Sequence, residues 1–238
     1  MLLRILRLST VVKLAGAKAH LINYNIHRTV MTESRETLFL RAHKFGKRTA
    51  IIDHRGSHSY EKILRLSFAL GERIIKLFGG NEDTNLKTKD LQEKRVAFLC
   101  PRDVSYVASQ WAVWRNGGIA VPLCDSHPES LWEYVLTDCQ ADVVITTSRY
   151  ASTLQNLADK NGMQFMLIDE ELSAVQREQN GVYELTEVEK KEMCWDERGA
   201  MIVYTSGTTG PPKGVLTTHG NIRLVFENNK IVPKFKPS

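Results

Sequence analysis

The chain has 238 residues, of which 42% are hydrophobic and 25% charged, so it can bury the core of one large domain or two small ones. Its formal net charge is +5, and residues 1–32 account for all of it, with five Lys or Arg and no Asp or Glu. Because residues 33–238 are balanced in charge, they predict no basic groove, which argues against a nucleic-acid partner.

The first 32 residues form an amphipathic, basic leader. Leu2 and Leu6 fall on one side of a helix, and Arg4 and Arg7 interrupt the apolar positions. This acid-free pattern is typical of a mitochondrial presequence, whereas a secretory signal needs a continuous apolar core. A transmembrane segment needs about 20 mostly apolar residues, which the charges exclude. We expect residues 1–33 to be a presequence that directs the protein to the mitochondrial matrix; a soluble basic arm is the alternative.

The segment after the leader predicts a helix, a hairpin and a second helix. Residues 33–45 have the pattern of a short helix, and residues 49–60 alternate as a β-hairpin does. Residues 61–80 have apolar side chains at helical spacing and end in two glycines. We expect His54 and His58, on either side of the hairpin turn, to be solvated.

From residue 94 onward, apolar strands alternate with helices. The predicted strands are 95–100, 117–123, 141–147, 163–169 and 199–204. One predicted helix begins at Asp103, and two others cover residues 127–140 and 148–162. This alternation builds βαβ units, so the sequence predicts an α/β fold with a parallel sheet covered on both faces. The polar residues 169–197 predict a loop.

Several conspicuous side chains have structural explanations. Asp103 is placed to cap the helix that follows it, and His219 and Asn221 are placed to cap the last helix. The residues predicted to be core by their helical spacing are Val104, Val107, Trp111, Trp114 and Trp132.

The four cysteines predict no metal site. They have neither CxxC spacing nor clustered histidines, and zinc needs four converging ligands. We expect Cys100, Cys124, Cys139 and Cys194 to be buried, reduced thiols.

The segment TSGTTGPPKG, residues 205–214, follows an apolar strand at the kind of position where open α/β sheets bind ligands. Gly207 and Gly210 can take a positive φ and present N–H groups to one anion, and the loop adds three hydroxyls and Lys213. These groups together predict a phosphate ligand. A surface turn is the alternative, but the pattern is long and specific for a turn.

The loop differs from that of Walker-type NTPases. Lys213 is preceded by Pro212 and followed by Gly214, where the Walker motif requires Gly before the Lys and Ser or Thr after it. Residues 215–219 also predict a strand, where the Walker motif requires a helix.

The string YTSGTTGPPKG resembles the signature loop of the adenylate-forming (AMP-binding) enzymes, which include acyl-CoA synthetases, luciferases and the adenylation domains of peptide synthetases. HSYEKI and WRNGGIAVPL resemble two weaker motifs of this family. FLCPRDVSYVASQWAVWRNGGIAVPL and ERGAMIVYTSGTTGPPKGVLTTHGNIR further resemble its mitochondrial malonyl-CoA synthetases. The resemblance implies that residues 34–228 are a partial N-terminal adenylation domain with a truncated sheet, and that residues 229–238 are a divergent tail.

The resemblance implies an ATP-dependent acid–CoA ligase. In this reaction a carboxylate, here malonate, attacks ATP to give acyl-AMP and pyrophosphate, and coenzyme A then displaces AMP. The partners implied are a small carboxylic acid, ATP and coenzyme A, with Mg²⁺ held by ligands outside this chain. The residues implied to bind the phosphates are Thr205, Ser206, Gly207, Thr208, Thr209, Gly210, Lys213 and Gly214, with Lys213 also catalytic.

Two alternatives stay open. Family members are more than twice this length, and their metal carboxylate, ribose-binding Asp, acyl pocket and lid lysine all follow the loop. The chain alone is therefore expected to be inactive, as a fragment with at most weak nucleotide binding. A medium-chain fatty acid in place of malonate is the other alternative.

We predict that the leader is imported and then removed near Met31–Ser34, where the acidic residues begin. Mass spectrometry of the N-terminus of matrix protein measures the cleavage. An intact Met1 recovered from a cytosolic fraction would contradict the prediction.

Overall fold

The computed structural model describes residues 37–79, 90–177, 195–205 and 210–229. The chain divides into two compact units, Met1–Arg35 and Glu36–Ser238, and all described residues belong to the second. The predicted presequence lies outside the described residues, as do Cys194 and the loop residues 206–209. In the described part, no helix is long and apolar enough to cross a membrane.

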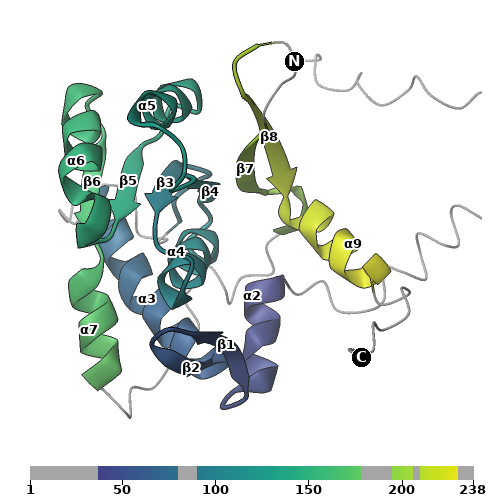
Figure 1. The fold of residues 1–238 in the computed structure, drawn as a ribbon. Coiled ribbons are helices and arrows are strands. Elements are labelled where there is room, and N and C mark those ends of the chain that lie inside the picture. Colours follow the sequence, from purple (N-terminus) through teal and green to yellow (C-terminus); the bar gives the residue numbers. More distant parts are fainter. Residues whose placement is uncertain (1–36, 80–89, 178–194, 206–209, 230–238) are drawn as a thin grey trace, which may run out of the picture. The chain divides into compact units, whose positions relative to one another are not determined.

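A six-stranded sheet with the order β6-β5-β3-β4-β7-β8 forms the centre of the second unit (Figure 1). Its strands are β3 (Arg95–Leu99), β4 (Ile119–Pro122), β5 (Val143–Thr146), β6 (Gln164–Leu167), β7 (Gly199–Thr205) and β8 (Lys213–Thr218). The first five are parallel, and β8 runs antiparallel to β7 at the edge. The predicted α/β fold with a parallel sheet is confirmed, with β8 as an antiparallel addition.

Helices cover both faces of the sheet. The longer helices are α3 (Tyr60–Leu77), α4 (Val104–Arg115), α5 (Glu129–Asp138), α6 (Ala151–Lys160), α7 (Asp169–Arg177) and α9 (His219–Asn229). One buried cluster joins α3, α4 and α7 to one face, and a second joins α5 and α6 to the other. Alternate residues of β3 serve the two clusters, since Phe98 lies in the first and Ala97 and Leu99 in the second.

Shorter elements complete the unit. They are α2 (Leu38–Arg41), the strands β1 (Thr49–Asp53) and β2 (Gly56–Ser59) of an antiparallel hairpin, and 3-10 turns at Ala42–Phe45, Ser148–Tyr150 and Trp195–Glu197. The predicted loop over residues 169–197 is wrong at its start, because residues 169–177 form α7. Leu172 of this helix is buried in the first cluster, and that contact outweighs the polar composition.

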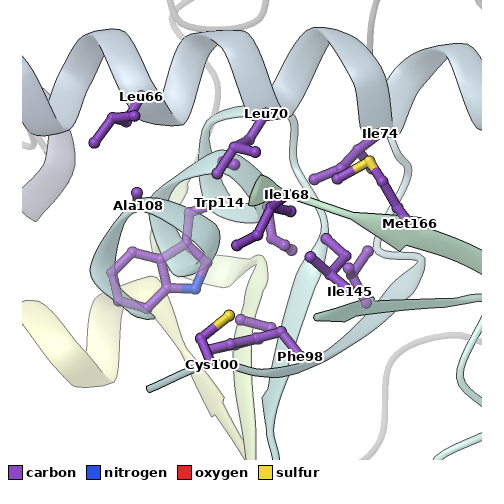
Figure 2. Close-up of a cluster of buried hydrophobic side chains, with 14 of the residues drawn as sticks. Leu66, Leu70, Ile74, Phe98, Cys100, Ala108, Trp114, Ile145, Met166 and Ile168 are labelled. Carbon is purple, nitrogen blue, oxygen red and sulfur yellow. The ribbon is translucent and has the colours of Figure 1, made fainter. Parts of the chain in front are cut away.

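The first cluster packs α3 closely against α4 and the sheet. Figure 2 shows Leu66, Leu70 and Ile74 of α3 in the same cluster as Phe98 and Ile145. Four fully buried positions of α4 hold small residues, namely Ser105, Ala108, Ser109 and Ala112. The predicted apolar face of α4 is right for Val104 and Trp114, but Val107 and Trp111 are only half-buried, as is Trp132 of α5. Small side chains let the two helices approach, which the apolar spacing did not reveal.

The hairpin is fixed to the start of α4 by buried acidic side chains. Asp53 Oδ2 accepts the Val104 N–H at 2.9 Å, and Asp103 Oδ1 accepts the Ser105 N–H at 2.9 Å, so Asp103 caps α4 as predicted. His58 Nε2 lies 2.9 Å from Asp53 Oδ1. Burial raises the pKa of the Asp53 carboxyl, but its hydrogen bonds to His58, Val104 and Arg55 outweigh burial and lower the pKa to about 2. His54 is exposed as predicted, whereas the prediction that His58 is solvated is wrong, because its side chain is 1% exposed.

His219 is a core residue and not a helix cap. Its ring centroid lies 5.3 Å from Trp195, 5.5 Å from Trp114 and 6.1 Å from Phe39, all in edge-to-face contact. Burial, helped by Arg198, lowers the pKa of its imidazole to about 4. The capping prediction holds for Asn221, which exchanges hydrogen bonds with Thr218 at the start of α9.

The described cysteines form no disulfide. Cys100 is buried, and burial raises the pKa of its thiol to about 12. Cys124 and Cys139 are only half-buried, so the prediction of buried thiols holds fully for Cys100 alone among the three.

We predict a pH-dependent stability that originates at His219. The folded pKa of about 4 lies below the ordinary 6.5, so this contribution is complete above about pH 6.5 and is lost as the pH falls toward 4. Between about pH 7.5 and 5 the loss should be on the order of 2 kcal/mol, measured by urea unfolding. His219→Phe keeps an aromatic ring without a titrating group and should remove this part of the pH dependence. An equally steep dependence in His219→Phe would contradict the assignment.

Candidate functional site

β7 and β8 bring together the two ends of the predicted phosphate loop. In their antiparallel ladder Thr205 pairs with Lys213 and Tyr204 pairs with Gly214. Residues 206–209, which include Ser206, Gly207, Thr208 and Thr209, lie outside the described residues. The predicted strand after the loop is confirmed as β8, so Thr205 and Lys213 lie side by side where the loop begins and ends.

Lys213 presents a cation that is unpaired among the described residues. Its side chain is exposed and makes no ion pair or hydrogen bond with another described residue. A strand position fixes the backbone of Lys213, while its long side chain keeps its rotational freedom. The ammonium group can therefore donate to an oxyanion near the loop without breaking a contact to any described residue.

The two described glycines of the loop act differently from each other. A Cβ at Gly210 would meet nothing within 4 Å among the described residues. A Cβ at Gly214 would lie 3.0 Å from Tyr204 Cζ and 3.0 Å from Ile202 Cγ2. Gly214 therefore makes room in the ladder for the Tyr204 ring, whereas no described side chain requires a glycine at position 210.

Helix α5 anchors both ends of the loop. The Tyr134 hydroxyl donates to the Pro212 carbonyl at 3.0 Å, and the Tyr204 hydroxyl donates to Asp138 Oδ2 at 2.5 Å. The rings of Tyr134 and Tyr204 meet edge to face with centroids 6.3 Å apart. Burial, together with the bond to Asp138, raises the pKa of the Tyr204 hydroxyl, so it stays a donor. These contacts hold Thr205 and Lys213 in place from outside the loop.

Sequence reasoning missed these anchoring residues. Tyr134 and Asp138 are one helical turn apart on α5, which places them on the same face. That spacing is a signal for a polar contact on an otherwise apolar helix face, but nothing in it identifies the loop as the partner.

A cavity of about 630 Å³ lies beside the loop, at the carboxyl ends of β3, β4 and β7. The residues before the loop, Val203 and Tyr204, form part of its wall. No group of three or more His, Cys, Asp or Glu side chains suited to a metal ion occurs in the described ranges. The described residues thus place an exposed lysine at the end of the loop and a cavity beside the strand that leads into it.

Comparisons with known proteins identify the family of this chain. The profile of the AMP-binding enzymes matches residues 38–233. The human protein "Malonate–CoA ligase ACSF3, mitochondrial" is 42% identical over 188 residues, which cover 79% of this chain and 31% of that protein. An Arabidopsis thaliana malonate–CoA ligase is 33% identical and has 31% of its length covered. The chain therefore spans about a third of the length of these relatives.

Solved structures agree on the fold. The ATP-bound MatB of Rhodopseudomonas palustris superimposes with a TM-score of 0.60 at 22% sequence identity, over 81% of this chain and 37% of MatB. At this identity the likeness extends to the fold alone.

We predict that Tyr134→Phe loosens the loop, because it removes the hydrogen bond to the Pro212 carbonyl. Backbone amides in residues 210–216 should exchange with deuterium faster, by roughly 2- to 12-fold for one neutral hydrogen bond. Exchange mass spectrometry of peptides from β7 and β8 measures this. Tyr150→Phe is the matched control, because the buried Tyr150 hydroxyl has no hydrogen-bond partner among the described residues. Equal exchange in both variants would show that α5 does not hold the loop.

Proposed function

This chain belongs to the AMP-binding enzyme family, and on that premise we propose that it supplies the phosphate-binding part of an ATP-dependent acid–CoA ligase. The ligase joins a carboxylic acid to coenzyme A while ATP is cleaved to AMP and pyrophosphate. We propose malonate as the acid, and the 42% identity with the human malonate–CoA ligase supports this choice.

The observation that carries the proposal is the position of Lys213. It lies opposite Thr205 in the β7–β8 ladder, at the ends of a loop that has the family signature, and its exposed side chain is unpaired among the described residues. An acid carboxylate must approach the triphosphate of ATP, and two anions repel each other. A cation near the β- and γ-phosphates lowers this repulsion and stabilises pyrophosphate as it leaves.

The proposed roles follow the two ends of the loop. Thr205 and the segment 206–210 hold phosphate oxygens through N–H and hydroxyl groups, and Lys213 supplies the charge. Gly214 keeps β8 close to β7 beside Tyr204, which fixes the direction of the strand that carries Lys213. Mg²⁺, which accompanies ATP in such reactions, would neutralise further phosphate charge, and we assign none of the described residues to it.

We further propose that the protein acts in the mitochondrial matrix, with residues 1–33 as presequence, residues 34–228 as the adenylation segment and residues 229–238 as a separate tail. The acid-free leader supports this location. The human relative is named mitochondrial, which supports it independently.

We predict that Lys213→Ala reduces kcat/KM for adenylate formation by roughly 10- to 150-fold, since a charge-assisted hydrogen bond contributes about 1.5–3 kcal/mol. The assay is ATP–pyrophosphate exchange with malonate. It is run on the 238-residue chain and on a chimera that joins residues 34–228 to the remaining length of a malonate–CoA ligase. Thioester formation from synthetic malonyl-AMP should change much less, because the β- and γ-phosphates have already left.

Controls separate the outcomes of this assay. Lys62→Ala on α3 removes a lysine remote from β8 and should have no effect. Octanoate in place of malonate tests a medium-chain acid as the alternative substrate. Exchange by the chimera but not by the 238-residue chain would make that chain an inactive fragment. Full activity of the Lys213→Ala chimera would contradict the role of Lys213.

A further inference from the structure

The cavity beside the loop lies at a topological switch point of the sheet. The chain leaves β3 for α4, which packs on the first cluster, and leaves the adjacent β4 for α5, which packs on the second. Because the two connections depart toward opposite faces, a crevice opens outside the carboxyl ends of β3 and β4. Open α/β sheets characteristically bind ligands in such a crevice.

The residues around this crevice agree with the topology. Cys100 and Arg102 follow β3, and Leu123, Cys124 and Asp125 follow β4. The Arg102 guanidinium lies 3.0 Å from Asp125 Oδ1, so an ion pair connects the two departing segments. The crevice is therefore built from both sides of the switch point, and it lies apart from Lys213, which does not line it.

The crevice is mainly apolar, and each Arg or Asp that lines it lies within 3.5 Å of an oppositely charged side chain. Arg102 pairs with Asp125, and Asp103 lies 3.5 Å from Arg55, while His127 adds one imidazole. The apolar walls are formed by Ile51, Val107, Leu123, Val135 and Val203. A dianion such as malonate would lose its hydration there, and the described lining residues include no unpaired Lys or Arg to compensate. An uncharged molecule loses little hydration free energy on entering such a crevice.

Tyr106 provides a polar group for such a molecule. It lines the crevice from α4, and its ring meets Phe98 edge to face with centroids 5.1 Å apart, which fixes the ring. Its hydroxyl makes no hydrogen bond with another described residue. Burial, with smaller effects of Cys100 and Cys124, raises the pKa of this hydroxyl, so it stays protonated and can donate.

We propose that the crevice outside the carboxyl ends of β3 and β4 binds a small, uncharged, mainly apolar molecule with a carbonyl group that accepts a hydrogen bond from Tyr106. This site is distinct from the phosphate loop and does not rest on the proposed ligase function. Val203 and Tyr204 connect the two places, because they line the crevice and lead directly into Thr205.

The experiment uses the 238-residue chain and three probes of similar size. Acetophenone has an apolar ring and a carbonyl acceptor, ethylbenzene lacks the acceptor, and benzoate adds a charge. Saturation-transfer NMR titrations should give saturable binding of acetophenone, with weaker binding of ethylbenzene and benzoate. Tyr106→Phe should weaken the binding of acetophenone by roughly 2- to 12-fold, as expected for the loss of one neutral hydrogen bond. The affinity for ethylbenzene should not change.

Val107→Trp places a large side chain in the crevice and should abolish binding of every probe. Val225→Trp on the exposed face of α9, outside the crevice, is the control and should bind like the parent chain. Thermal unfolding verifies that each variant is folded. Should Val107→Trp fail to fold, photolabelling of the parent chain by benzophenone locates the site instead, with labels expected on peptides that contain residues 100–107 or 122–127.

Any one of four results would overturn the proposal. The first two are an absence of saturable binding, and acetophenone binding that is unaffected by Tyr106→Phe and Val107→Trp. The other two are tighter binding of benzoate than of acetophenone, and photolabels confined to other peptides. ATP–pyrophosphate exchange is measured on the same samples. A chain that binds acetophenone without exchange activity, or the reverse, separates the failure of one proposal from the failure of the other.

Discussion

The burial of β3 on both faces is the constraint on which the rest of the described fold depends. Its side chains alternate between two clusters, so helices must cover both sides, and the connections after β3 and β4 must depart in opposite directions. The crevice at the switch point follows from that divergence. Helix α4, which covers one of these faces, is held at its start by the carboxylates of Asp53 and Asp103. Its small buried side chains let α3 pack close to it.

The β7–β8 pair meets a different requirement. The phosphate-binding role proposed for the loop requires donors and a cation that stay uncommitted, so stabilisation from outside the loop suits this role. Here the stabilisation comes from α5, through the bonds of Tyr134 to Pro212 and of Asp138 to Tyr204. Lys213 remains unpaired among the described residues while both ends of the loop are held.

The edge formed by β8 and α9 exposes apolar side chains, among them Leu216 and Val225, which are 55% and 59% exposed.

Buried polar groups mark the points where distant segments meet. Asp53 of the hairpin lies against Val104, and Trp114 Nε1 donates to the Ala200 carbonyl at 2.6 Å, which links α4 to β7. His219 is enclosed by rings from three other elements. Each contact satisfies or shields a polar group that water cannot reach, and each joins residues far apart in the sequence.

The sequence alone determined the order and type of most central elements and the start of α4 at Asp103, because periodicity, caps and turn residues are local signals. The phosphate-binding chemistry of the loop around Lys213 stays a prediction. It misjudged residues 169–177, His58 and His219, whose burial depends on partners supplied by remote segments. Only the tertiary structure decided that α5 anchors the loop and that the connections after β3 and β4 diverge into a crevice. The physical reason is that contact across a sheet is set by strand order and by the face each helix covers, and neither quantity has a local pattern along the chain.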